Sequence, residues 1–244
     1  MTDPSASDKA ERVLIVNGDD FGRTPGINSG VIRAHEHGIL TSASLMVRWP
    51  AAADAARYCR ARPALDLGLH LDLGEWVFRE GAWHEVYHVG DSWDVDALRA
   101  EVHAQLEAFQ RLVGRSPTHL DSHQHVHLRE PVRTAVLEQS RRLQVPARDC
   151  GRDIRYCGDF YGQPGTGEPW PANITVEAFV RIVNGLRPGV TELGCHPGEN
   201  ADFDSVYRVE RTEEVRVLCD SAVRRAHGGR RAIGTGFPGR CGSA

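Results

Sequence analysis

The chain has 244 residues, of which 41% are hydrophobic and 25% charged, a composition typical of a soluble globular protein with a substantial core. Its formal net charge of -4 argues against a nucleic-acid-binding protein, which normally presents a basic surface. The polar N-terminus, MTDPSASDKAER, lacks the apolar core of a signal peptide, and no apolar run is long enough to span a bilayer. Six scattered cysteines without a C-x-x-C pair favour reduced thiols. We therefore expect a cytoplasmic protein with no membrane or nucleic-acid partner.

Strand and helix patterns alternate along the chain. Strands are predicted at 12–17, 39–47, 65–71, 117–123 and 190–196, and helices at 27–38, 50–63, 94–113, 131–143 and about 210–227. Repeated strand–helix units imply parallel strands with helices outside, arranged as a barrel or as an open doubly wound sheet. Of the two, we predict an α/β fold of the distorted (β/α) TIM-like barrel type. It is expected to form a single domain over residues 1–244, with a flexible tail at 1–10 and no clear final strand at 230–244.

Two stretches interrupt this alternation. Residues 72–93 contain Trp76, Trp83 and Trp93, and residues 150–172 are rich in glycine and proline and include Trp170. Both are too long for ordinary connections, which favours functional loops over linkers.

A polar motif sits at the end of each of four predicted strands: VNGDDFG, GLHL, DSHQHVH and GCHPG. In parallel α/β folds the carboxyl ends of the strands share one face, and that face holds the active site. We therefore expect the polar residues of these motifs to converge, namely Asp19, Asp20, His70, Asp121, His123, His125 and His196.

The adjacent aspartates Asp19 and Asp20 have two interpretations. They can form a solvated turn, or one carboxylate can hold a metal ion while the other handles a proton. A divalent cation beside one of them would lower its pKa and cancel the repulsion between the two charges. The histidines that follow the other strands favour the second interpretation.

Histidines supply the remaining candidate ligands. His70 alone could be a buried core histidine. In THLDSHQHVH, strict alternation puts the four histidines and Asp121 on one side of an extended segment. Not all of them can be ligands, and two or three must instead support the ligands or face solvent. Two histidines and one carboxylate with open positions are a common catalytic arrangement for a divalent metal. The pattern therefore predicts Asp20, His70 and one of His123 or His125 as ligands, for Zn²⁺ by ligand type or for Mg²⁺.

Together, VNGDDFG, GLHL, PTHLDSHQHVH and GCHPG resemble the motifs of the YdjC family of carbohydrate deacetylases, which includes the chitooligosaccharide deacetylases. The resemblance covers about residues 11–227 and extends to GILTSASLMV and RTEEVRVL. It implies a distorted (β/α) barrel and a metal ion held by Asp20, His70 and His123.

The same resemblance assigns roles around the metal. Asp19 matches the general base, and His196 stands where a general acid is expected, a task that suits a histidine with a pKa near neutrality. Arg148 in VPARDCG matches an arginine that orients the base or binds substrate. The implied substrate is an N-acetylated sugar of the N-acetylglucosamine type, as a mono- or oligosaccharide, which is cleaved to acetate and an amino sugar. Candidate substrate contacts are Asp121, His125 and Trp76, since exposed tryptophans suit stacking on sugar rings.

Two rival functions and the oligomeric state stay open. The H-x-H pair of His123 and His125 also occurs in metal-dependent amidohydrolases and phosphoesterases, but those usually carry it on the first strand, which here ends in Asp-Asp. A non-catalytic carbohydrate-binding protein on the same scaffold would have lost the base or a ligand, and this chain keeps each candidate. A homo-oligomer is compatible with the sequence.

Overall fold

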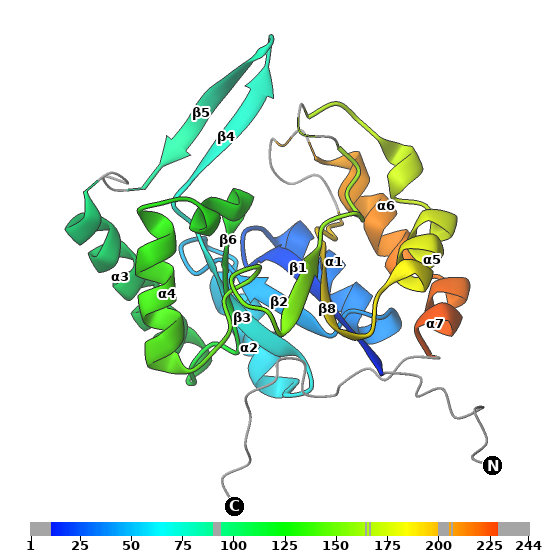
Figure 1. Cartoon of the computed structure of the whole chain (residues 1–244), viewed down its shortest axis with the longest axis horizontal. Helices are drawn as coiled ribbons and strands as arrows, with labels where there is room; N and C mark the ends of the chain where they lie inside the picture. The colour runs from blue at the N-terminus through cyan, green and yellow to red at the C-terminus, as the bar shows by residue number, and fades with distance from the viewer. Residues whose placement is uncertain are drawn as a thin grey trace, which may run out of the picture.

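A computed structural model describes residues 11–89, 94–163, 165, 167–199, 205 and 207–228 (Figure 1). The predictions for 1–10, for Trp93 and for 230–244 lie outside these ranges. The elements are β1 (Arg12–Phe21), α1 (Pro25–His37), β2 (Ser42–Leu45), α2 (Ala52–Ala61), β3 (Asp66–Leu71), β4 (Gly74–Arg79), β5 (Ala82–His88), α3 (Val95–Val113), β6 (Leu120–Ser122), η1 (His123–Leu128), α4 (Val132–Leu143), β7 (Ile154–Cys157), η2 (Pro171–Asn173), α5 (Val176–Gly185), β8 (Gly189–Cys195), α6 (Val209–Leu218) and α7 (Ser221–Gly228). None of the helices in the described ranges combines the length and the apolar character that crossing a bilayer requires.

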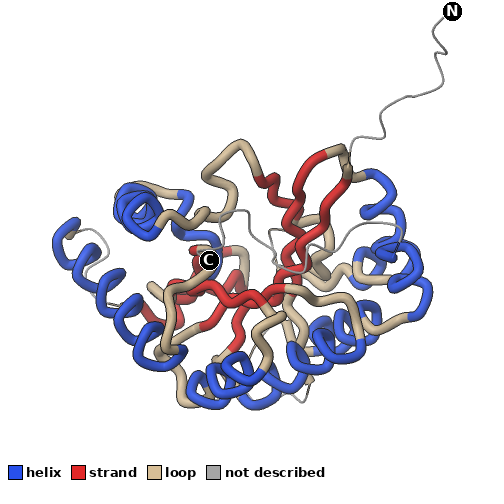
Figure 2. Tube along the Cα trace, turned by 90° about the horizontal axis from the view of Figure 1, so that it is seen from below, coloured by secondary structure: helices blue, strands red, loops and turns tan. Residues whose placement is uncertain are grey.

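Six strands form one parallel sheet in the order β6-β3-β2-β1-β8-β7. Figure 2 shows this sheet curled like half of a barrel, with helices along its outer side. The prediction of an α/β fold with a distorted barrel of parallel strands is thus confirmed. Because all six strands run in the same direction, their carboxyl ends lie on one face of the sheet.

The core lies between the curled sheet and the outer helices. β1 and β3 are buried along almost their whole length, as expected for strands covered on both faces. The predicted helix at 94–113 is confirmed as α3, which begins at the capping carboxylate of Asp94 and ends at Gly114, where φ is 78°. Its buried side chains include Leu98, Val102 and Phe109, which belong to the main hydrophobic cluster.

Residues 72–93 were predicted as a long loop but contain an antiparallel hairpin, β4–β5, which projects away from the parallel sheet in Figure 1. Its turn residues Glu80 and Gly81 have φ of 53° and 80°, the left-handed pair that a two-residue hairpin turn needs. Side-chain hydrogen bonds fix the base of the hairpin: the hydroxyl of Tyr87 donates to Asp72 over 2.9 Å, and the same carboxylate accepts from the indole of Trp49 over 3.0 Å.

Three other expectations need correction. The loop predicted at 150–172 includes β7, which pairs with β8 and extends the sheet. The helix predicted at 210–227 is divided into α6 and α7, because Asp220 interrupts it and accepts a hydrogen bond of 2.7 Å from the backbone of Ala222. The strand predicted at 117–123 is only the three residues of β6, since η1 begins directly after Ser122.

Candidate active site

The two adjacent aspartates of β1 reach the same site because the strand contains a bulge. The pairing of β1 with β2 shifts register between Gly18 and Phe21. Within this shift Asp20 has a φ of 63°, a left-handed conformation that aspartate tolerates better than most residues. A regular strand would send neighbouring side chains to opposite faces. Here both Asp19 and Asp20 place a carboxylate oxygen beside His70.

Asp20, His70 and His123 bring their ligand atoms together at the carboxyl ends of β1, β3 and β6. The Oδ1 of Asp20 lies 3.4 Å from Nε2 of His70 and 3.1 Å from Nδ1 of His123. One ligand atom from each residue lies within 4.8 Å of the others, and all three residues are buried. The geometry therefore selects His123, not His125, as the third member of the cluster.

This cluster fits a divalent cation. The Nδ1 of His70 lies 2.8 Å from Asp121, which leaves the Nε2 of His70 directed at Asp20. Burial lowers the pKa of His70, but the charges and hydrogen bonds of the surrounding carboxylates outweigh it and raise the pKa to about 10. The site therefore favours positive charge, and two imidazoles with a carboxylate are ligands that suit a catalytic divalent metal.

A buried arginine holds the other oxygen of Asp20. The guanidinium of Arg211 lies 2.5 Å from Oδ2 of Asp20. Burial raises the pKa of Asp20, but the charges of Arg211 and His123 more than offset this and keep it well below its usual range. The carboxylate is thus ionised, with Oδ1 facing the imidazoles.

Asp19 is held separately, by Arg148. Two nitrogens of this fully buried guanidinium donate hydrogen bonds of 2.7 Å to the two oxygens of Asp19. The same guanidinium contacts Asp121 and Glu192, each at 2.6 Å. Burial raises the pKa of Asp19, but the charge and hydrogen bonds of Arg148 outweigh it and lower the pKa. The two neighbouring aspartates are thus held by different arginines.

His196 faces Asp19 from the end of β8. Its Nε2 lies 3.8 Å from Oδ2 of Asp19, and its ring packs against Tyr161 and Tyr207 with centroid distances of 5.1 and 5.7 Å. Burial lowers the pKa of His196 to about 4, more than the charge of Asp19 raises it. The imidazole is therefore neutral at pH 7, in contrast to the near-neutral pKa expected for this residue.

The other histidines of the 117–127 stretch do not share one side, so the predicted alternation was wrong. The extended segment ends at Ser122, and Gln124 and His125 have φ of 51° and 54°. The Nε2 of His125 lies 3.3 Å from the hydroxyl of Tyr156. The Nδ1 of His127 instead lies 2.7 Å from the hydroxyl of Ser122. These left-handed residues turn the chain and direct the histidines to different neighbours.

A cavity of about 370 Å³, the central pocket, lies over the cluster. Its lining includes Asp20, Glu75, Trp76, His123, His125 and His196. Two of the predicted substrate residues, Trp76 and His125, are thus at its surface. The third, Asp121, is 0% exposed and lies behind His70, where its Oδ2 also accepts a hydrogen bond of 2.6 Å from Ser44.

The family model for the YdjC-like protein matches residues 13–227, which include the whole cluster. The chain belongs to this family. A chitooligosaccharide deacetylase from Salmonella schwarzengrund (strain CVM19633) is 32% identical, over 88% of this chain and 94% of the relative. A relative of the same name from Salmonella agona (strain SL483) has the same identity and coverage.

Solved structures place the YdjC-like chain in a wider group of folds. A candidate cellobiose-phosphate cleavage protein from Enterococcus faecalis V583 superposes with a TM-score of 0.71 at 24% identity, covering 91% of this chain and 95% of that one. A family 4 carbohydrate esterase from Streptomyces lividans gives a TM-score of 0.56 at 10% identity, covering 94% and 96%. At these identities the likeness concerns the fold alone.

Several charged residues of this YdjC-like site were not predicted from the sequence. Glu192 lies in the apolar run VTELGC, where a lone carboxylate in a buried strand was an available signal. Arg211 and Glu214 belong to RTEEVRVL, and both are buried, although charged residues on a helix are usually solvated. Glu75 lies on the hairpin that was not predicted, and it forms an ion pair with Arg23.

Glu214 makes the stability of the protein depend on pH. It accepts hydrogen bonds from the hydroxyl of Tyr207, at 2.5 Å, and from the backbone N–H of His196. Burial raises the pKa of Glu214 from its ordinary 4.5 to about 8, more than these hydrogen bonds lower it. Since the folded state keeps a proton that the unfolded chain releases, the free energy of unfolding is expected to fall as the pH rises across this interval. Glu192, whose pKa burial raises to about 7, adds to the same fall.

Glu214→Gln should therefore flatten this pH dependence without abolishing it. The free energy of unfolding would be measured by urea titration between about pH 4.5 and 9. Glu213→Gln is the matched control, because Glu213 is its neighbour in α6 and forms an exposed ion pair with Arg216. A slope as steep in Glu214→Gln as in the control would show that Glu214 is not protonated in the folded protein.

Proposed function

We propose that this chain is a metal-dependent carbohydrate deacetylase, which removes the acetyl group from an N-acetylated sugar and yields acetate and an amino sugar. The observation that carries the proposal is that a three-residue cluster that fits a cation lies next to a second carboxylate, that of Asp19, which Arg148 holds separately. The names of the Salmonella relatives support a substrate of the N-acetylglucosamine type.

The proposed metal ligands are Asp20, His70 and His123, with Zn²⁺ favoured by ligand type and Mg²⁺ as the alternative. A divalent cation bound there would polarise the acetamide carbonyl and lower the pKa of water. Asp121 orients His70 through its Nδ1, and Arg211 holds the far oxygen of Asp20. The ligand atoms are therefore fixed before a cation binds.

Asp19 is the proposed general base. Arg148 holds both of its oxygens, so the carboxylate has one orientation and is ionised at neutral pH. Each oxygen of a carboxylate has two lone pairs, so Oδ2 can accept a proton from water while it still bonds to Arg148. Arg148 is thus proposed as a positioning residue for the base, not as a substrate ligand.

His196 is the proposed general acid, which protonates the departing amine. Because its imidazole is neutral at rest, it needs a proton during each turnover. The Oδ2 of Asp19, 3.8 Å from Nε2 of His196, is placed to pass on the proton that it takes from water. The two residues would then work in sequence, with the base supplying the acid.

Substrate would occupy the central pocket, whose volume of about 370 Å³ suits a small ligand such as one acetylated sugar ring. Trp76 and His125 are the proposed contacts of that ring. We assign Asp121 to the support of His70, because it has no exposed surface.

The proposal is tested by assaying acetate and phosphate release under the same conditions. Protein stripped of metal with a chelator should release no acetate from N,N′-diacetylchitobiose, and added Zn²⁺ or Mg²⁺ should restore release. Metal content would be measured by mass spectrometry in parallel. Phosphate release from sugar phosphates without acetate release would favour the phosphoesterase alternative, and acetate release from fully stripped protein would contradict metal dependence.

A further inference from the structure

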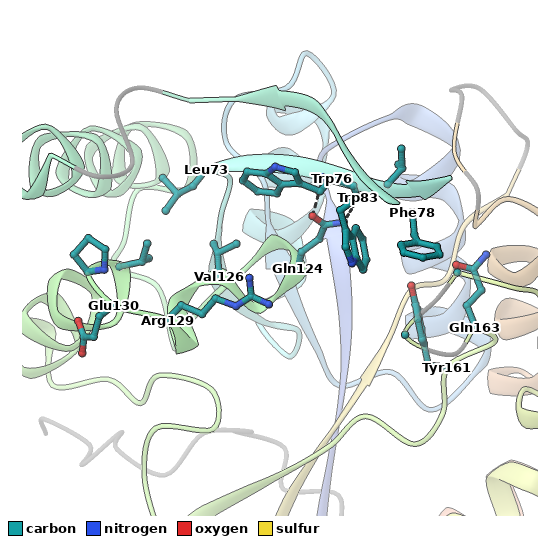
Figure 3. A pocket seen from close by; sticks show the side chains of 15 residues that line it. Leu73, Trp76, Phe78, Trp83, Gln124, Val126, Arg129, Glu130, Tyr161 and Gln163 are labelled. Carbon is teal, nitrogen blue, oxygen red and sulfur yellow. Dashed lines mark hydrogen bonds between the residues drawn. The ribbon is translucent and has the colours of Figure 1, made fainter. Parts of the chain in front are cut away.

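A second and larger cavity, of about 750 Å³, lies under the β4–β5 hairpin. We call it the hairpin cleft. Its apolar lining includes Trp76, Phe78 and Trp83 from the hairpin, and Val126, Pro131 and Val132 from η1 and the start of α4. Figure 3 shows the side chains of Phe78 and Trp83 pointing down from the hairpin into this space, while Trp76 lies along the hairpin and Val126 and Arg129 lie on the opposite side.

The hairpin cleft adjoins the central pocket. Trp76, Val77, Gln124 and Tyr161 line both cavities. Tyr161 also packs against the ring of His196, at a centroid distance of 5.1 Å. A ligand whose sugar lies in the central pocket can therefore extend into the cleft past Trp76 and Tyr161.

The walls of the cleft are ordered before a ligand binds. The side-chain amide of Gln124 bonds to both backbone groups of Trp76, accepting over 2.9 Å and donating over 2.6 Å. The hydroxyl of Tyr87 and the carboxylate of Glu75 fix the hairpin to Asp72 and Arg23. A ligand thus meets a formed cleft and need not order the hairpin.

The chemistry of the lining favours an apolar occupant over further sugar rings. The aromatic rings of the hairpin could stack on a sugar, but the aliphatic side chains on the other side, Val126, Pro131 and Val132, offer no hydrogen-bond partner. Sugar hydroxyls buried against them would lose their bonds to water without replacement. The amide of Gln124 is used by Trp76, and the carboxylate of Glu130 accepts two hydrogen bonds from Thr134, at 3.1 and 2.8 Å. Arg129 gives such an occupant one charged point of contact.

Trp83 is the most exposed aromatic side chain in the lining of the cleft. The side chain is 60% exposed although it lines an apolar cavity. Its ring packs edge-on against Phe78 at a centroid distance of 5.4 Å. A large aromatic surface held open to solvent next to an apolar cavity is typical of a binding site. An apolar ligand would cover it.

We propose that the hairpin cleft binds a large apolar or aromatic group joined to the acetylated sugar, so that the preferred substrates are amphiphilic glycosides. This inference rests on the proposed deacetylase function. It adds a specificity site, formed by the hairpin, to the acetamide-cleaving centre.

The test compares acetate release from three substrates by the metal-loaded protein: the methyl and octyl β-glycosides of N-acetylglucosamine, below the micelle concentration, and N,N′-diacetylchitobiose. The octyl glycoside should exceed the methyl glycoside in kcat/KM by roughly tenfold or more, the gain expected when several methylene groups leave water. In calorimetry, octyl β-glucosaminide, which has no acetyl group to lose, should likewise bind more tightly than methyl β-glucosaminide.

Trp83→Ala should reduce the octyl-to-methyl ratio of kcat/KM by about fivefold, since an aromatic wall is lost. Trp170→Ala is the matched control, because Trp170 is 51% exposed and does not line the cleft. Acetate release from the methyl glycoside without an octyl preference would overturn the cleft assignment alone. Chitobiose exceeding the octyl glycoside would also overturn it and make the cleft a sugar site. No acetate release from any of the three would instead overturn the proposed function.

Discussion

Asp19→Asn is expected to reduce acetate release by about 10²–10⁴-fold while leaving bound metal nearly unchanged. The amide keeps a hydrogen bond to Arg148 but cannot accept a proton from water. The loss should appear in kcat, because the side chain acts on the proton and not on the sugar. The measurements are steady-state acetate release and the metal content of the same preparation.

Asp20→Asn gives the contrasting control at the neighbouring position. It replaces a charged oxygen of the three-residue cluster, so it should lower metal content and lose activity for that reason. If Asp19→Asn lost metal as Asp20→Asn does, the two aspartates would share one role. If Asp19→Asn kept near wild-type turnover, another group would be the base.

The convergence of the site was predictable because it follows from topology. Once the strands are parallel, their carboxyl ends must lie together, and Asp20, His70, His123 and His196 each lie at or near the end of a strand that the apolar pattern identified. That these residues gather at one face of the sheet is therefore a consequence of chain direction.

What the sequence did not predict depends on local departures from regular structure. The alternation of side chains along a strand gives no sign of the bulge that turns Asp19 and Asp20 to one site, since a bulge inserts a residue without changing the composition of the strand. The same applies after Ser122, where the chain leaves the strand and disperses the histidines. Distant partners such as Arg211 were hidden for another reason, because a charged residue on a helix is usually solvated.

The β4–β5 hairpin was missed although its turn carries a recognisable signal. Glu80-Gly81 can adopt the left-handed pair of a tight turn, but β5 is mostly exposed and lacks the apolar alternation by which strands are recognised. The hairpin owes its position to side-chain bonds, such as those of Gln124 and Tyr87. These long-range contacts cannot be read from local pattern.

Arg148→Met is expected to lower the free energy of unfolding of the metal-free protein by about 3–5 kcal/mol at neutral pH. The guanidinium is fully buried and contacts the carboxylates of Asp19, Asp121 and Glu192. Methionine fills similar space but leaves these three acids without a counter-charge. Their folded pKa values would rise, because burial is then no longer offset, so the folded state would lose stability as the pH increases.

The pH dependence makes this expectation specific. The stability deficit of Arg148→Met should be smaller near pH 5 than near pH 8, because protonation removes the unpaired charges, and adding Glu192→Gln should recover part of it. Arg99→Met is the matched control: Arg99 forms an exposed pair with Glu138 at 2.8 Å, whose loss should cost far less stability because solvent screens the pair. Urea unfolding of all variants at both pH values provides the comparison. A stability deficit in Arg148→Met no larger than that in Arg99→Met would mean that the folded protein tolerates the three buried acids without the arginine. The proposed role of Arg148 in positioning Asp19 would then be contradicted.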